Sequence, residues 1–182
     1  MSDAAIQAIA RYSGTLWLDG LSDLSDAKAQ ALANHCGDLS LAGLTQMSEG
    51  TAAILSQHMG GFLCLNGLRY INENLAAILA RHRGSLLALN GLIDITDAVA
   101  QKLAKHRGKL HLHGLNHLSD SVATAFAENT GGLQFSIKEL SEAAAAALAT
   151  HKGRSLSIIG FRQENYSPSH RALWVKLNSR HL

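Results

Sequence analysis

The segment HLHGLNHL, at residues 111–118, places His111, His113 and His117 close together in the chain. Imidazole is a common ligand for zinc and copper, and an H-x-H pair can present two rings on one face of a strand. A zinc site needs a third or fourth protein ligand near the first two. The chemistry of this segment therefore depends on the elements that position it.

Composition narrows the classes of protein and partner. The chain has 182 residues, and this length is enough for one domain with a core. Of these residues, 47% are hydrophobic and 16% are charged. A net charge of +2 is too small to favour nucleic acid as a partner. No apolar run approaches the roughly 18 residues of a membrane span, and the N-terminus lacks a signal-peptide pattern, so we expect a cytoplasmic protein. Cys36 and Cys64 form no CxxC motif, and we expect both to be reduced.

A unit of 22 to 24 residues recurs along the chain. Each unit begins with a Ser, Thr or Asn followed by an acid, a pair typical of a helix N-cap and first turn. A glycine follows twelve residues after the cap, so we expect a helix of about nine residues that ends at a left-handed glycine. The caps are Ser2, Ser25, Ser48, Asn72, Thr96, Ser119 and Ser141, and the glycines are Gly14, Gly37, Gly60, Gly84, Gly108, Gly131 and Gly153.

Between each glycine and the next cap, two large apolar residues stand two apart. This period predicts a short strand whose two apolar side chains point into the core. The pairs are Leu16/Leu18, Leu39/Leu41, Leu63/Leu65, Leu87/Leu89, Leu110/Leu112, Leu133/Phe135 and Leu156/Ile158. One strand and one helix cannot bury a core alone, so we expect the units to stack side by side.

The two ends of the chain complete a single domain over residues 1–182. Residues 1–13 provide an N-terminal helix, expected at 3–11, and residues 14–160 contain the strand–helix repeats. Residues 161–182 form a C-terminal cap, in which Ser167 and Pro168 begin a helix and Leu173, Trp174 and Leu177 give it an apolar face. We expect the tail at 178–182 to fray.

The repeat pattern L-x-L-x-G-L-x-x-L-[ST]-[DE]-x-x-A-x-x-L-A-x-H-x-G resembles bacterial leucine-rich repeat proteins over roughly residues 2–160. The resemblance implies an α/β, right-handed solenoid with a parallel sheet on the concave face, helices on the convex face and a C-terminal capping helix. It also implies non-catalytic binding of a protein or peptide on the concave face, and we expect no cofactor. The turn departs from the family, because leucines such as Leu44 and Leu68 stand where its asparagine ladder is expected.

One polar column recurs two residues before the glycines, and we call it the histidine column. It contains Tyr12, His35, His58, His82, His106, Asn129 and His151. In a parallel stack these side chains would lie about 5 Å apart. They could form a metal or proton ladder, but Tyr12 and Asn129 are unusual zinc ligands, which favours a structural role at helix C-termini. Neutral packed imidazoles predict a loss of stability below about pH 6.

The same register gives HLHGLNHL its place. His111 stands between inward Leu110 and Leu112, so His111 and His113 face outward from the sheet, while His117 lies in the following loop. The adjacent strands offer no carboxylate or thiolate beside the pair. We therefore interpret His111 and His113 as contact residues on a binding surface rather than as metal ligands.

Other large side chains also have no core-facing position in this register. Trp17, Phe62 and Leu86 form an apolar patch rimmed by charged residues and histidines, which is typical of a protein-binding surface. The alternative is a register slip at Gly60-Gly61 and Gly84-Ser85 that turns Phe62 or Leu86 inward. The predicted partner-binding residues, which we call the sheet-face set, are Trp17, Asp19, Asp38, Phe62, Cys64, Leu86, Lys109, His111 and His113.

No sequence signature of an enzyme is present: the chain lacks GxSxG, HExxH, a Walker loop and GxGxxG. The acids after the caps are explained as helix-start residues. Four basic residues near the C-terminus are interpreted as a solvated end, too few to indicate nucleic-acid binding: Arg162, Arg171, Lys176 and Arg180.

We expect a protein- or peptide-binding scaffold that is not an enzyme and binds neither nucleic acid nor membrane. Two alternatives stay open: a metal-binding or pH-responsive protein, and a structural module that self-associates through the concave face.

Overall fold

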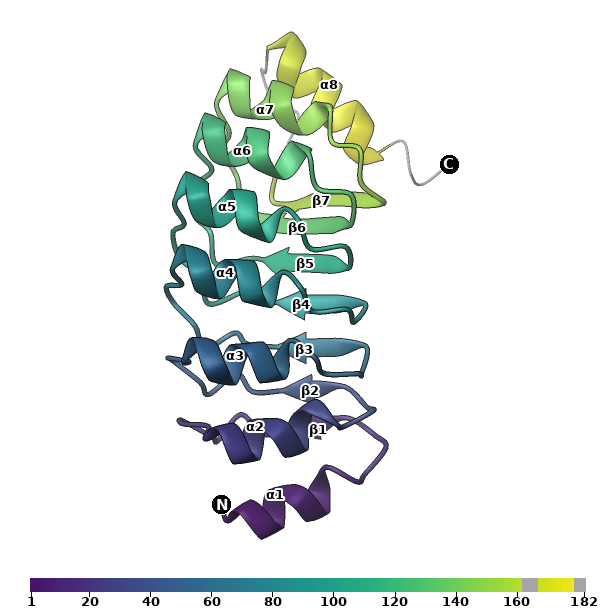
Figure 1. The fold of residues 1–182 in the computed structure, drawn as a ribbon. Coiled ribbons are helices and arrows are strands. Elements are labelled where there is room, and N and C mark those ends of the chain that lie inside the picture. The colour runs from purple at the N-terminus through teal and green to yellow at the C-terminus, as the bar shows by residue number, and fades with distance from the viewer. Residues whose placement is uncertain (162–166, 179–182) are drawn as a thin grey trace.

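A computed structural model describes residues 1–161 and 167–178. In these residues helices and strands alternate along the chain, and Figure 1 shows them stacked in order, with the helices on one side and the strands on the other. The helices are α1 (Asp3–Ile9), α2 (Asp26–Ala33), α3 (Glu49–Leu55), α4 (Glu73–Leu79), α5 (Asp97–Leu103), α6 (Asp120–Ala127), α7 (Glu142–Ala149) and α8 (Pro168–Asn178). The strands are β1 (Leu16–Trp17), β2 (Leu39–Ser40), β3 (Phe62–Cys64), β4 (Leu86–Ala88), β5 (Lys109–Leu112), β6 (Gly132–Ser136) and β7 (Ser155–Ile159).

The strands form one sheet in sequence order, and every neighbouring pair is parallel. Each connection between parallel neighbours passes through one helix, as a repeat of this length requires. The predicted strand in each of the seven units is therefore confirmed, and so is the stacking of the units into an α/β repeat array.

The helix starts follow the sequence closely. At all seven predicted caps the side-chain oxygen accepts a hydrogen bond from the backbone N–H three residues later, with an acid in the first turn. Helices α1 to α7 contain seven or eight residues, slightly fewer than expected. The residue after each is a C-cap in the right-handed α conformation, so the helix ends before the glycine is reached.

The predicted role of the glycine column is wrong. Gly160 is the one glycine of the described residues with a positive φ, so the column does not supply left-handed helix ends. A Cβ at Gly60 would instead overlap the backbone carbonyl of Gly37 and the ring of His58. Glycine is required there because backbones of adjacent repeats approach too closely for a side chain.

The core lies between the sheet and the helices. The inward strand residues are buried, except for the partly buried Leu18 at the N-terminal end, and they pack against the large apolar residue of each helix. Alanines such as Ala29, Ala52 and Ala76 are also fully buried, which lets neighbouring helices lie close together. Phe126 and Phe135 are the bulkiest fully buried side chains, and their ring centroids are 5.3 Å apart.

Helix α8 closes the C-terminal end of the stack beside α7, as Figure 1 shows. It begins at Pro168 as predicted, and Leu173 is fully buried against the last repeat. His170 lies near this interface, with Nε2 2.9 Å from the Leu140 carbonyl oxygen. The frayed tail predicted at 178–182 falls, beyond Asn178, outside the described residues, as do Arg162 and Arg180.

Lys176 has a structural function that the solvated-end interpretation missed. Its ammonium group donates to the carbonyl oxygen of Ala149 at 3.0 Å and also to that of His151. These carbonyls lie at the C-terminal end of α7, where the helix itself provides no donors.

Within the described residues, no helix is long and apolar enough to span a bilayer.

Candidate functional site

The outward face of the sheet has the predicted register. Phe62 pairs with Leu86 and Leu86 with Lys109, while Leu63 and Leu87 point inward and are fully buried. The register slip that would have turned Phe62 or Leu86 inward is therefore excluded. The two apolar side chains lie on adjacent strands of the outward face, each partly exposed.

Exposure differs strongly along the central column of this face. Trp17 on β1 is 69% exposed, whereas Ser40, Cys64 and Ala88 on the next strands are 1%, 4% and 2% exposed. These small side chains lie between flanking columns that include Phe62 and Leu86 on one side. A partner approaching the face would reach Trp17 and the flanking columns, and would reach little of the Cys64 thiol.

Both predicted rim carboxylates bond to the neighbouring strand. Asp19 Oδ1 accepts hydrogen bonds from the Ser40 hydroxyl at 2.6 Å and from the Ala42 N–H at 2.9 Å. Asp38 Oδ1 accepts from the Phe62 N–H at 3.0 Å. Each aspartate thus satisfies a backbone donor in the following repeat, which sequence reasoning did not foresee.

Two asparagines continue this pattern. Asn66 Oδ1 accepts from the Asn90 N–H at 2.8 Å, and Asn90 Oδ1 accepts from the His113 N–H at 3.1 Å. The column that begins at Asp19 therefore contains a side-chain ladder, interrupted at Ala42, whose side chain has no acceptor. Each member stands one residue before a turn glycine, a position that the pattern of turn leucines does not indicate.

His111 and His113 lie together as predicted. Their rings stack with centroids 5.4 Å apart and an interplanar angle of 14°. Burial lowers the pKa of His111, and the nearby His113 and Lys109 lower it further. His117 is exposed in the loop before α6. Among the described residues, no group of three or more His, Cys, Asp or Glu side chains is placed to hold a metal ion.

The histidine column forms a continuous stack of four imidazoles. Ring centroids are 6.1 Å apart for His35–His58, 5.9 Å for His58–His82 and 6.0 Å for His82–His106, and all four side chains are buried. His35 Nδ1 lies 3.2 Å from the Ala10 carbonyl oxygen, the helix-end contact expected of the whole column. At the ring nitrogens of His58, His82 and His106, no protein partner among the described residues has the geometry of a hydrogen bond.

Burial determines the protonation of the stack. Desolvation lowers the pKa of His82 to about 4, and the neighbouring His106 and His58 lower it in the same direction. Desolvation also lowers the pKa of His58 and His106. Backbone groups at Ala80 and Lys109 favour the charged form of His106, although neither contact has the geometry of a hydrogen bond. These three imidazoles are therefore neutral at pH 7.

Two polar side chains, one within the column and one beyond its last residue, donate hydrogen bonds to carbonyls near helix C-termini. Asn129 Nδ2 donates to the carbonyl oxygens of Ala104 and His106, both at 2.8 Å. Lys176 of α8 makes the same kind of contact one step beyond His151, the last residue of the column, with the carbonyls of Ala149 and His151. The cap helix thus supplies the column residue that an additional repeat would have supplied.

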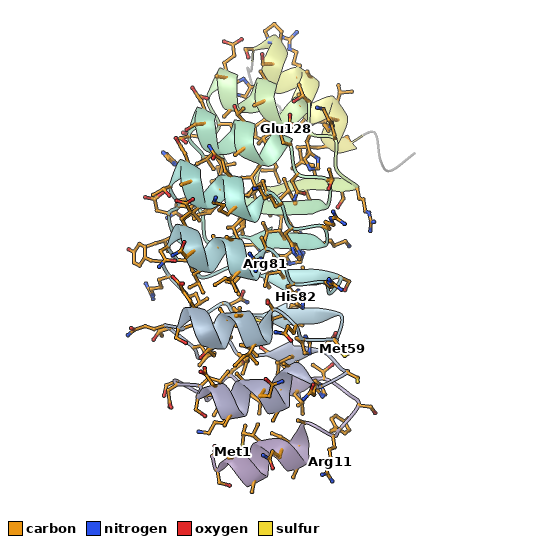
Figure 2. All side chains as sticks on the ribbon, in the orientation of Figure 1. Met1, Arg11, Met59, Arg81, His82 and Glu128 are labelled. Atoms are coloured by element: carbon orange, nitrogen blue, oxygen red, sulfur yellow. The ribbon has the colours of Figure 1, made fainter. Side chains whose placement is uncertain are left out.

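A second surface was missed by the sequence analysis. The edge where helices α4 and α5 end and strands β4 and β5 begin contains a groove of about 1010 Å³. Seven of its fifteen lining residues are Lys or Arg and none is Asp or Glu. We call it the basic groove. The signal lay in the residues that flank the histidine column, Arg81 and Arg83 around His82, and Lys105 and Arg107 around His106. Figure 2 shows Arg81 and His82 at the end of α4.

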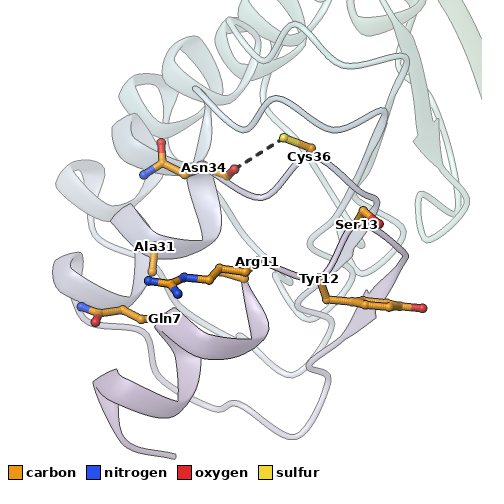
Figure 3. Close-up of a pocket in the computed structure, with 8 residues that line it drawn as sticks. Gln7, Arg11, Tyr12, Ser13, Ala31, Asn34 and Cys36 are labelled. Carbon is orange, nitrogen blue, oxygen red and sulfur yellow. Dashed lines mark hydrogen bonds between the residues drawn. The ribbon is translucent and has the colours of Figure 1, made fainter.

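A smaller hollow of about 410 Å³ lies at the N-terminal end of the same edge. Figure 3 shows its lining residues, which come from α1, α2 and the segments that follow them. Cys36 is exposed here as a free thiol, with Sγ 3.8 Å from the Asn34 carbonyl oxygen. The hollow has one basic side chain, Arg11, so it lacks the concentrated charge of the basic groove.

Comparison with known proteins identifies no family for this chain. No protein-family model matches the sequence, and no curated protein matches it. The fold by itself defines a parallel α/β repeat array.

Proposed function

We propose that this chain is a non-catalytic scaffold of the bacterial leucine-rich repeat type, a right-handed solenoid that binds a protein or peptide on a concave sheet face. The observation that carries the proposal is the outward face itself: within the described residues no helix covers it, and it presents Trp17 at 69% exposure. Exposed aromatic side chains are enriched at protein interfaces because they bury a large area when a partner binds.

The remaining contacts complete an interface of mixed chemistry. Phe62 and Leu86 supply adjacent apolar surface, and Lys109 and the stacked pair His111 and His113 supply polar groups at its edge. Asp19 and Asp38 present one carboxylate oxygen to the neighbouring strand, which fixes their position in the rim. An apolar centre with a fixed polar rim is the usual organisation of a protein-binding surface.

The experiment is affinity capture from an extract of the source cells, with an exposed aromatic on another side as the control. Trp17→Ser removes the aromatic from the sheet face, whereas Tyr70→Ser removes one that is equally exposed, at 67%, in the loop before α4. We expect Trp17→Ser to lose the captured partner and Tyr70→Ser to retain it. Equal recovery by wild type and Trp17→Ser would contradict the proposal.

Self-association through the same face is the competing function that the exposed apolar residues favour. Light scattering on wild type, Phe62→Asp and Leu86→Asp separates the two. A dimer that both substitutions dissociate supports self-association, whereas a wild-type monomer supports binding of a different protein.

A further inference from the structure

The basic groove lies on a different side from the sheet face, where helix C-termini lead into strands. Its walls come from α4 and α5, from the segments that join them to β4 and β5, and from residues at the starts of β6 and β7. With a volume of about 1010 Å³ it is a concave site, at the upper end of the range for ligand pockets. Lys109 is the one sheet-face residue that also reaches the groove.

Positive charge is concentrated in the groove, and five of its seven basic side chains have no acidic partner among the described residues. Arg81, Arg83, Lys105, Arg107 and Lys109 are exposed, and none forms an ion pair within the described part of the chain. Lys102 in the same lining pairs with Glu73 at 2.9 Å. The buried ring of His82 is neutral at pH 7, so the charge comes from lysine and arginine. Cations left unpaired on one concave surface attract an anionic ligand.

Helix dipoles do not account for this charge. A cation near a helix C-terminus is favourable, so a dipole effect would place one in every repeat. The residues on either side of the histidine column are instead Arg11 and Ser13, Asn34 and Cys36, Gln57 and Met59, Arg81 and Arg83, Lys105 and Arg107, Glu128 and Thr130, and Thr150 and Lys152. Figure 2 labels Met59, Arg81 and Glu128 on successive parts of this edge. Both flanks are basic in two consecutive repeats, those that form the groove.

The residue types that line the groove favour a carboxylate ligand over single-stranded nucleic acid. Single-stranded nucleic acid is held by aromatic side chains that stack on its bases, and among the described residues no Phe, Tyr or Trp lines the groove. Its uncharged lining includes Ala77 and Ala80, which offers apolar contact between the cations. Arginine binds a carboxylate through two parallel hydrogen bonds, and Arg81, Arg83, Arg107 and Arg154 all line the site. Strands spaced about 4.8 Å apart make the distance from β4 to β7 roughly 14 Å, a span of about four residues of extended chain.

We propose that the basic groove binds an acidic peptide segment of a partner protein in an extended conformation. The side-chain carboxylates pair with Arg81, Arg83, Lys105 and Arg107, and small apolar residues between them contact Ala77 and Ala80. This site shares Lys109 with the sheet face, but it does not depend on the function proposed for that face.

The test measures binding of a fluorescein-labelled peptide that alternates glutamate and alanine, by fluorescence anisotropy at low and physiological salt. A peptide with glutamine in place of glutamate and a single-stranded oligonucleotide of equal length serve as competing probes. We expect the glutamate peptide to bind more tightly than both, with an affinity that falls as salt is added.

Two variants with the same net charge locate the site. Arg83→Glu/Arg107→Glu reverses charge in the groove, and Arg11→Glu/Arg69→Glu reverses the same charge at exposed positions outside it. We expect the groove variant to bind the glutamate peptide about tenfold or more weakly and the control to bind like wild type. Circular dichroism verifies that both variants are folded. Trp17→Ser, which alters the sheet face, leaves this binding unchanged.

Three results would overturn the proposal. The first is no binding of the glutamate peptide at low salt, and the second is an equal loss in the groove variant and its charge-matched control. The third is tighter binding of the oligonucleotide than of the glutamate peptide at physiological salt, which would make the groove a nucleic-acid site.

Discussion

The imidazole rings of His82 and His106 stack in the protein interior with their centroids 6.0 Å apart, and neither ring makes a hydrogen bond. Both side chains are at most 2% exposed. Two such rings are stable neighbours only while neutral, because a proton on either one would place an unsolvated charge beside the other. Acidification should therefore destabilise the stack.

Stability is expected to fall as pH decreases from about 6.5 to about 4. The pKa of His82 is about 4 in the folded chain and 6.5 when unfolded, so the unfolded state binds more protons in this window and acid favours unfolding. Each pKa unit corresponds to about 1.4 kcal/mol, so His82 alone removes roughly 3 kcal/mol by pH 4. Chemical denaturation at several pH values measures this loss.

The control for this prediction is His82→Asn, which copies the natural Asn129 of the same column. Asparagine does not titrate, so the variant should show a smaller loss of unfolding free energy between pH 6.5 and 4 than wild type does. An acid dependence identical to that of wild type would show that other groups cause it.

The two glycines Gly60 and Gly50 should respond in opposite directions to alanine. At Gly60 a Cβ would overlap the Gly37 carbonyl, so Gly60→Ala forces adjacent repeats apart and should cost at least about 2 kcal/mol. At Gly50, in the first turn of α3, the nearest atom would be 3.6 Å away, and alanine should add about 0.5 to 1 kcal/mol. Urea denaturation of both variants checks the pair, and a stable Gly60→Ala would refute the close-approach explanation.

Lys176→Met should lower the free energy of unfolding by about 1 to 3 kcal/mol. Methionine keeps the apolar stem but leaves the carbonyls of Ala149 and His151 without the ammonium donor that α8 provides. Arg171→Met, at an exposed position of the same helix, is the matched control and should change stability little. Thermal unfolding followed by circular dichroism compares the two, and equal melting temperatures would contradict the capping role.

Much of the fold was predictable because the relevant contacts are local. A cap such as Ser48 bonds the N–H of Thr51 three residues away, and the inward side chains Leu63 and Leu65 follow from strand pleating alone. Repetition of these short-range rules also fixed the strand register, which placed Phe62 beside Leu86 and Trp17 beside Ser40.

The misjudged features all depend on contacts one repeat or more away. Gly60 is constrained by Gly37, Asp19 bonds to Ser40 and Ala42, and Lys176 reaches Ala149. The basic groove likewise requires side chains from several repeats to meet at one edge. Local periodicity specifies which way a residue points, whereas the distance between stacked backbones specifies what it touches. The amino-acid sequence by itself therefore determined the helices, the strands and the inward or outward direction of each strand side chain. The packing of one repeat on the next determined the close backbone contacts, the capping partners and the basic groove.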